Sequence, residues 1–179
     1  IVYNAFPRFI GSPQIILPRP MIGAWRALRA QAQGRVNAWL VPMIDPVSYA
    51  VGRGSWQSEW AAYLAGQYVE PRPKVVATAA ASAGDTTITV DETGAQEPVR
   101  IGAYLSYDDW PFIVTARSGS GAAVTLTVAM LRTAIPDEAE IDLYARGVFV
   151  SVDDAAGGAQ YALNGPLTVQ PTFVEWITR

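Results

Sequence analysis

The middle of this chain alternates short β-forming runs with turn sequences, and this spacing constrains the fold more than any other feature. The runs are Val75–Ala80, Thr86–Val90, Ile101–Ser106, Pro111–Ala116, Ala123–Val128 and Ile141–Tyr144. Turn-forming residues separate them, among them Ser82–Asp85, Asp108-Asp109 and Ser118–Gly121. Short strands spaced about 8–12 residues apart are typical of a small barrel or sandwich, which we therefore expect over residues 74–146.

The first 23 residues predict an extended arm, because they contain Pro7, Pro13, Pro18 and Pro20. Proline fixes φ and removes a backbone donor, so at most a short strand at Gln14–Leu17 is expected here. The apolar residues of this arm need a surface to lie on. That surface is either the chain's own core or a neighbouring copy.

A helix is expected over Ala24–Gln33, which is rich in good helix formers. Its pattern places Trp25, Leu28 and Ala32 on one face, and Gly34 follows as a stop signal. A strand over the same residues is the weaker alternative. Val36–Ile44 then predicts a strand that ends near Pro42.

Two regions leave alternatives open. Residues 47–73 show rough helical spacing but are equally compatible with two short strands, and they end in the break Glu70–Pro73. Strands are expected over Val148–Val152, Gln160–Leu163 and Thr172–Thr178. The pattern does not decide whether these three strands pair with the middle block or with the N-terminal region.

The chain has no cysteine and no histidine. This composition excludes disulfides, thiolate nucleophiles, Cys-based metal sites and Ser–His–Asp triads. We therefore expect no catalytic residue, no bound metal and no cofactor, and hence no enzyme. A hairpin tip is the favoured interpretation of Ser118–Gly121, because this stretch lacks the lysine of a phosphate-binding loop.

Carboxylate pairs are the remaining candidates for chemistry. Asp108/Asp109 and Asp153/Asp154 both lie at predicted turns, where aspartate bonds to nearby backbone. A turn role is favoured over a calcium site or an acid–base pair. The cluster Asp137–Glu140 is expected to be a solvated loop.

The charge of the chain is small overall but unevenly placed. The net charge is −3, which gives no basic surface for direct nucleic-acid binding. Residues 1–73 carry seven arginines against three acids, and residues 74–146 carry five bases against ten acids. Two solvated surfaces of different sign would explain this, and so would attraction between copies in a ring or stack. No apolar run is long enough to span a bilayer, so we expect no membrane partner.

Aromatic and arginine side chains are enriched at protein interfaces, and the chain has six Trp and eight Tyr. Core packing is expected for Trp25 and Trp39. The candidates for contacts with partners are Pro7, Arg8, Ile15, Pro18, Arg19, Trp56, Trp60, Tyr63 and Trp110.

Three segments together resemble the distal tail proteins of siphophages. Trp25–Ala30 followed by Gly34–Pro42 is similar to that family's helix and "GR-x-N-x-F-x-V-P" strand, with Trp39 in the aromatic position. The middle block, with Ala83–Val90, Ile101–Ser106 and Phe112–Thr115, looks like a β insertion common in tail proteins. The segment Phe173–Trp176 resembles the "F-x-E" strand that ends many tail-tip domains.

The resemblance implies a non-enzymatic virion protein that forms a homo-oligomeric ring, typically a hexamer, between the tail tube and the tail-tip hub proteins. Such a protein is made in the host cytoplasm and located in the virion tail. The expected fold is mostly β: a β-sandwich core with one short helix and an inserted small β-barrel or sandwich. Residues 1–73 and 147–179 would form the ring-forming core, and residues 74–146 the insertion. The alternatives are another virion protein (tube, terminator or minor tip protein) or a carbohydrate-binding β module.

Overall fold

The computed structural model describes residues 8–43, 61–62, 64–67, 73–95, 97–152 and 166–178. These residues form a mostly β protein with a short helix and several antiparallel sheets, which confirms the predicted fold class. The chain divides into two compact units. We call Ile1–Val41 with Val148–Arg179 the sheet unit, and Pro42–Gly147 the barrel unit.

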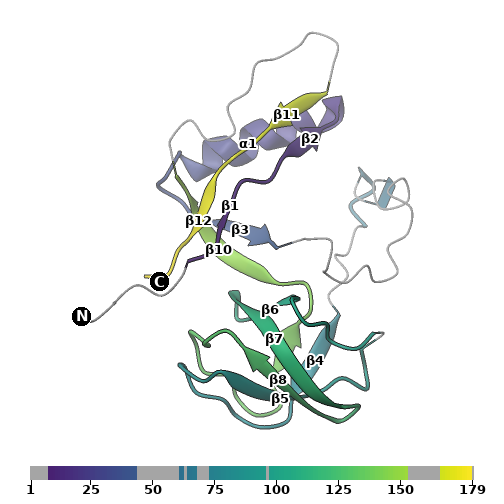
Figure 1. The fold of residues 1–179 in the computed structure, drawn as a ribbon. Coiled ribbons are helices and arrows are strands. Elements are labelled where there is room, and N and C mark those ends of the chain that lie inside the picture. The colour runs from purple at the N-terminus through teal and green to yellow at the C-terminus, as the bar shows by residue number, and fades with distance from the viewer. Residues whose placement is uncertain are drawn as a thin grey trace, which may run out of the picture. The chain divides into compact units, whose positions relative to one another are not determined.

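The barrel unit contains a closed antiparallel barrel with the strand order β4-β5-β8-β7-β6-β9 (Figure 1). Its strands are β4 (Lys74–Ala77), β5 (Thr87–Asp91), β6 (Tyr104–Tyr107), β7 (Trp110–Ser120), β8 (Ala123–Val128) and β9 (Glu140–Asp142). Closure leaves no unpaired strand edge in this barrel, which suits strands as short as these. Each of the six runs expected from the sequence overlaps one of these strands.

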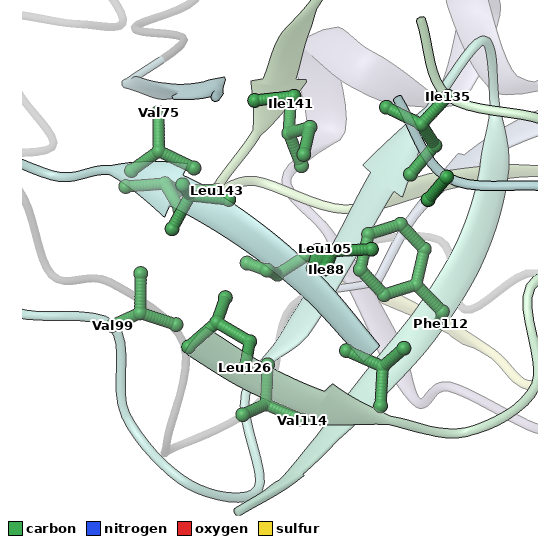
Figure 2. Packing of buried hydrophobic residues seen from close by; sticks show 14 of the residues in the cluster. Val75, Ile88, Val99, Leu105, Phe112, Val114, Leu126, Ile135, Ile141 and Leu143 are labelled. Atoms are coloured by element: carbon green, nitrogen blue, oxygen red, sulfur yellow. The ribbon is translucent and has the colours of Figure 1, made fainter. Parts of the chain in front are cut away.

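Alternation along the strands fills the barrel with aliphatic side chains. In β5 and β8, Ile88, Val90, Val124 and Leu126 are buried, whereas the residues between them face outward. Figure 2 shows the side chains of different strands, including Leu105, pointing toward one another in the barrel interior. Burying such side chains stabilises the fold by about 1.5–3 kcal/mol each.

A salt bridge fastens the loop that follows β5. Arg117 Nη2 donates to Glu92 Oε1 at 2.7 Å, and Arg117 Nη1 donates to the carbonyl of Val99 at 2.8 Å. The backbone N–H of Val99 in turn donates to Glu92 Oε2 at 3.0 Å. Glu92 is buried, so these hydrogen bonds replace the ones that its carboxylate makes to water in the unfolded chain.

The sheet unit contains an antiparallel sheet of order β1-β12-β10-β3 and a separate pair, β2 with β11. Its elements are β1 (Ile10–Gly11), β2 (Ile15–Leu17), the 3₁₀-helix η1 (Arg19–Met21), α1 (Ile22–Ala32), β3 (Trp39–Pro42), β10 (Arg146–Ser151), β11 (Leu167–Val169) and β12 (Phe173–Glu175). The expected helix is confirmed. It ends one residue earlier than the sequence suggests, because Gln33 adopts the left-handed conformation (φ 49°) that Gly34 was expected to supply.

The N-terminal arm pairs with the C-terminal strands of the same chain. β1 pairs with β12, and β2 pairs with β11, in one continuous register. Continuing that register places Pro13 opposite Pro171. Neither proline can donate a hydrogen bond, so the ladder breaks there. From Arg8 onward the arm therefore lies on the chain's own body, which is one of the two surfaces that the sequence left open.

Helix α1 packs on the β2–β11 pair through one apolar cluster. Trp25 is buried with Leu17, Leu167 and Val169. The ring of Trp39 lies 5.9 Å from that of Trp25, which confirms the expected core packing of both tryptophans. Figure 1 shows α1 alongside β2 and β11.

Some expected elements lie outside the described residues, among them the strand at Gln160–Leu163 and most of residues 47–73. Within the latter, residues 61, 62 and 64 are helical.

Candidate functional site

The sheet β1-β12-β10-β3 has two faces, and the register of the paired strands assigns their residues to one face or the other. Val150 pairs with Val174, and Val174 pairs with Ile10. Directly paired residues of antiparallel strands point to the same side. Phe149 and Glu175 form the neighbouring pair and therefore point to the opposite side.

The face that carries Phe149 and Glu175 is covered by other parts of the sheet unit. Phe149, Ser151, Phe173 and Glu175 are all buried. The ring of Phe173 lies 5.6 Å from that of Trp39, so this face continues into the core beneath α1.

The opposite face, which carries Ile10, Val150 and Val174, is exposed to solvent although its side chains are apolar. Ile10 is 70% exposed and Trp176 is 39% exposed. Leu40 is 50% exposed, and it lies on this side because its neighbour Trp39 points to the covered one. We call this surface the open face and define it by Ile10, Leu40, Val150, Val152, Val174 and Trp176.

A sheet that faces water on one side normally alternates apolar and polar residues. The open face departs from that rule: Val150 and Val174 are half-buried side by side at its centre. Continuing the β1–β12 register places Arg8 beside Trp176, and Arg8 is exposed. Contiguous exposed apolar surface of this kind marks interaction sites.

Beneath the open face, Glu175 connects β12 to the N-terminal arm. Its carboxylate Oε2 accepts a hydrogen bond of 3.0 Å from the backbone N–H of Phe9. The backbone N–H of Glu175 donates to the carbonyl of Phe9 at 2.9 Å. These two bonds hold the start of the arm against β12, and so they also hold Ile10 in the open face.

The residues predicted to contact partners differ in their exposure to solvent. Arg8, Pro18 and Arg19 are exposed. Ile15 packs against the chain's own core beside Trp25. The predicted contacts of Pro7, Trp56, Trp60 and Tyr63 fall outside the described residues.

Trp110 lies at one end of the barrel. It pairs with Tyr107 across the β6–β7 hairpin, next to the buried pair Leu105–Phe112. Side chains two residues apart on a strand share a face, so Trp110 and Tyr107 lie on the inward side of this hairpin. Trp110 is half-buried there.

The predicted turn role of Asp108 and Asp109 agrees with the geometry. Both have positive φ, 48° and 60°, and they form the two-residue loop between Tyr107 and Trp110. Asp109 Oδ1 lies 2.8 Å from Arg146 Nη2. The second pair, Asp153/Asp154, lies outside the described residues. In the part of the chain that the structure describes, no group of three or more acidic side chains is arranged to hold a metal ion.

Among the described residues, no helix is long and apolar enough to cross a membrane. No protein-family model matches the sequence, and no curated protein matches it either. The resemblance to distal tail proteins therefore stays a prediction that depends on the segments quoted above.

The open face was not among the residues selected from the sequence, but a signal for it exists. Residues 148–152 read Val-Phe-Val-Ser-Val, and residues 173–177 read Phe-Val-Glu-Trp-Ile. Both stretches are apolar at nearly every position. Such runs are typical of strands that are buried on both faces.

Proposed function

We propose that this protein is a non-catalytic structural subunit of a siphophage-type tail. In this role it forms the ring that joins the tail tube to the tail-tip hub. The observation that carries the proposal is the open face, a sheet surface with the composition of a buried one. A protein that works by assembly needs such a surface, because a partner removes it from water.

The segments that resemble distal tail proteins support this assignment through their mutual packing. Trp25 and Trp39 belong to the helix-and-strand segment, and Phe173 belongs to the last segment. The ring of Trp39 contacts both others in tilted geometry, with centroid separations of 5.9 Å to Trp25 and 5.6 Å to Phe173. Two of the three resembling segments therefore contribute to one core, and the open face is the other side of the sheet that carries Phe173.

Immunogold labelling of virions tests the proposal. Antibodies against the barrel unit should decorate intact particles at one position, the end of the tail tube where the tip begins. Class averages of the purified protein, alone or with tube and hub proteins, should show a closed ring with cyclic symmetry. Labelling of the capsid, or of the whole tube length, would assign the protein to another part of the virion. Absence of label from virions would refute the proposal.

A further inference from the structure

We propose that the open face is covered by the barrel unit of a second copy of this chain, so that copies associate head to tail. This inference rests on the proposed assembly function and names the partner of its surface. The charges of the two units and the surface of the barrel around Val76 support it.

The two units carry opposite charge. The described part of the sheet unit has the five arginines Arg8, Arg19, Arg26, Arg29 and Arg35, and one acid, Glu175, which is fully buried. Residues 73–147 of the barrel unit have ten acids and five bases. A contact between the sheet unit of one copy and the barrel unit of the next therefore brings unlike charges together. A contact between two sheet units brings like charges together.

The barrel also offers an apolar side chain between acids. Val76 is 39% exposed on the outer side of β4, whereas its neighbours Val75 and Ala77 point into the barrel. The register places Asp91 on one side of Val76 and Glu140 on the other. Lys74, which pairs with Glu140, is the nearby base.

This surface complements the open face. Ile10 and Trp176 supply apolar area, and Arg8 beside them supplies positive charge. Val76 and its flanking carboxylates supply the opposite pattern. A contact between two different surfaces of one chain is heterologous, and it closes into a ring when its rotation permits. The charge separation thus favours the type of contact that a ring subunit needs.

Sedimentation velocity of the full chain over a concentration series tests the inference, with one substitution on each surface. Ile10→Gln removes an apolar side chain from the open face, and Val76→Lys places a positive charge on the barrel surface that would face the basic sheet unit. Each substitution should lower the self-association constant about tenfold or more. Ile16→Gln and Ile101→Lys are the matched controls, because Ile16 is 64% exposed on β2 and Ile101 is 57% exposed in the barrel unit. Both controls should associate like the parent chain, and thermal melts should show that all four variants are folded.

Mixing the two altered chains gives the decisive result. The Ile10→Gln chain keeps its barrel surface and the Val76→Lys chain keeps its open face, so together they should form a 1:1 pair and nothing larger. A parent chain that stays monomeric at every concentration would overturn the inference. So would normal association of the Val76→Lys chain, or association lost equally in the Ile16→Gln control. These outcomes are independent of the virion labelling, so a head-to-tail protein that is absent from tails would refute only the proposed function.

Discussion

Two aspartates occupy a turn whose backbone is better suited to glycine. Asp108 and Asp109 both have positive φ in the β6–β7 loop, where Asn-Gly is the preferred sequence. Asp109→Gly and Asp109→Asn both remove the ion pair with Arg146, but glycine is freer to adopt the left-handed conformation. We expect Asp109→Gly to be about 0.5–1 kcal/mol more stable than Asp109→Asn in urea unfolding. Equal stability would mean that the turn carries no strain.

Gly119 is required by a close backbone contact. Its φ is 84°, and a Cβ added there would lie 2.3 Å from the carbonyl oxygen of Ala123. Gly119→Ala should therefore destabilise the barrel by about 2–4 kcal/mol, since both the conformation and the contact oppose it. Gly94→Ala is the control, because its Cβ would meet nothing within 4 Å. Calorimetric melts of the two variants should differ clearly, and similar melts would contradict the close approach of the two strands at Gly119.

Asp91 makes barrel stability depend on acid pH. The side-chain hydroxyl of Thr93 and then its backbone N–H donate to Asp91 Oδ1 at 2.6 Å and 2.8 Å, and they hold the pKa of this carboxyl below its ordinary value of 3.8. The folded state therefore gains stability above the unfolded pKa, and it loses that gain as pH falls through the lower folded pKa. Unfolding free energies measured from about pH 5 to pH 2 should fall less steeply in Asp91→Asn than in the parent chain. Parallel curves would contradict this contribution.

At the scale of elements, the Glu92–Arg117 pair holds the loop after β5 to β7. Removing one partner leaves the other charge poorly solvated, so Arg117→Met should cost about 3 kcal/mol. The double variant Glu92→Met/Arg117→Met should cost less than the sum of the two single substitutions. A double-mutant cycle in denaturant measures the coupling directly. Additive costs would show that the two side chains act independently.

The barrel was predictable from the sequence because its strands alternate locally, as Thr87–Asp91 and Ala123–Val128 do. The elements β1 and β11 were not, because each is stabilised by a partner at the other end of the chain. The open face was missed for a related reason. Its composition is visible in the apolar stretches around Val150 and Val174, but only the register shows that these residues share one uncovered side.

At the scale of the whole molecule, the uneven charge of the sequence follows the division into two units. In the proposed head-to-tail assembly, the basic sheet unit of one copy and the acidic barrel unit of the next attract each other over distances comparable to the Debye length, about 8–10 Å near physiological salt. The apolar open face supplies the short-range contact that salt does not screen. Salt should therefore weaken the electrostatic part of the association and leave the apolar part unscreened.

Raising sodium chloride from about 0.05 M to 0.5 M should weaken self-association, because screening reduces the attraction between the units. Replacing part of the chloride with sulfate at equal ionic strength should restore it in part, because sulfate strengthens apolar burial. Light scattering at fixed protein concentration measures both effects. The substitution Arg8→Gln, which removes the charge beside Trp176, should flatten the chloride dependence and leave the sulfate response intact. Association that strengthens steadily with chloride would mean that apolar contact alone joins the copies, and that the charges of the two units act only within each molecule.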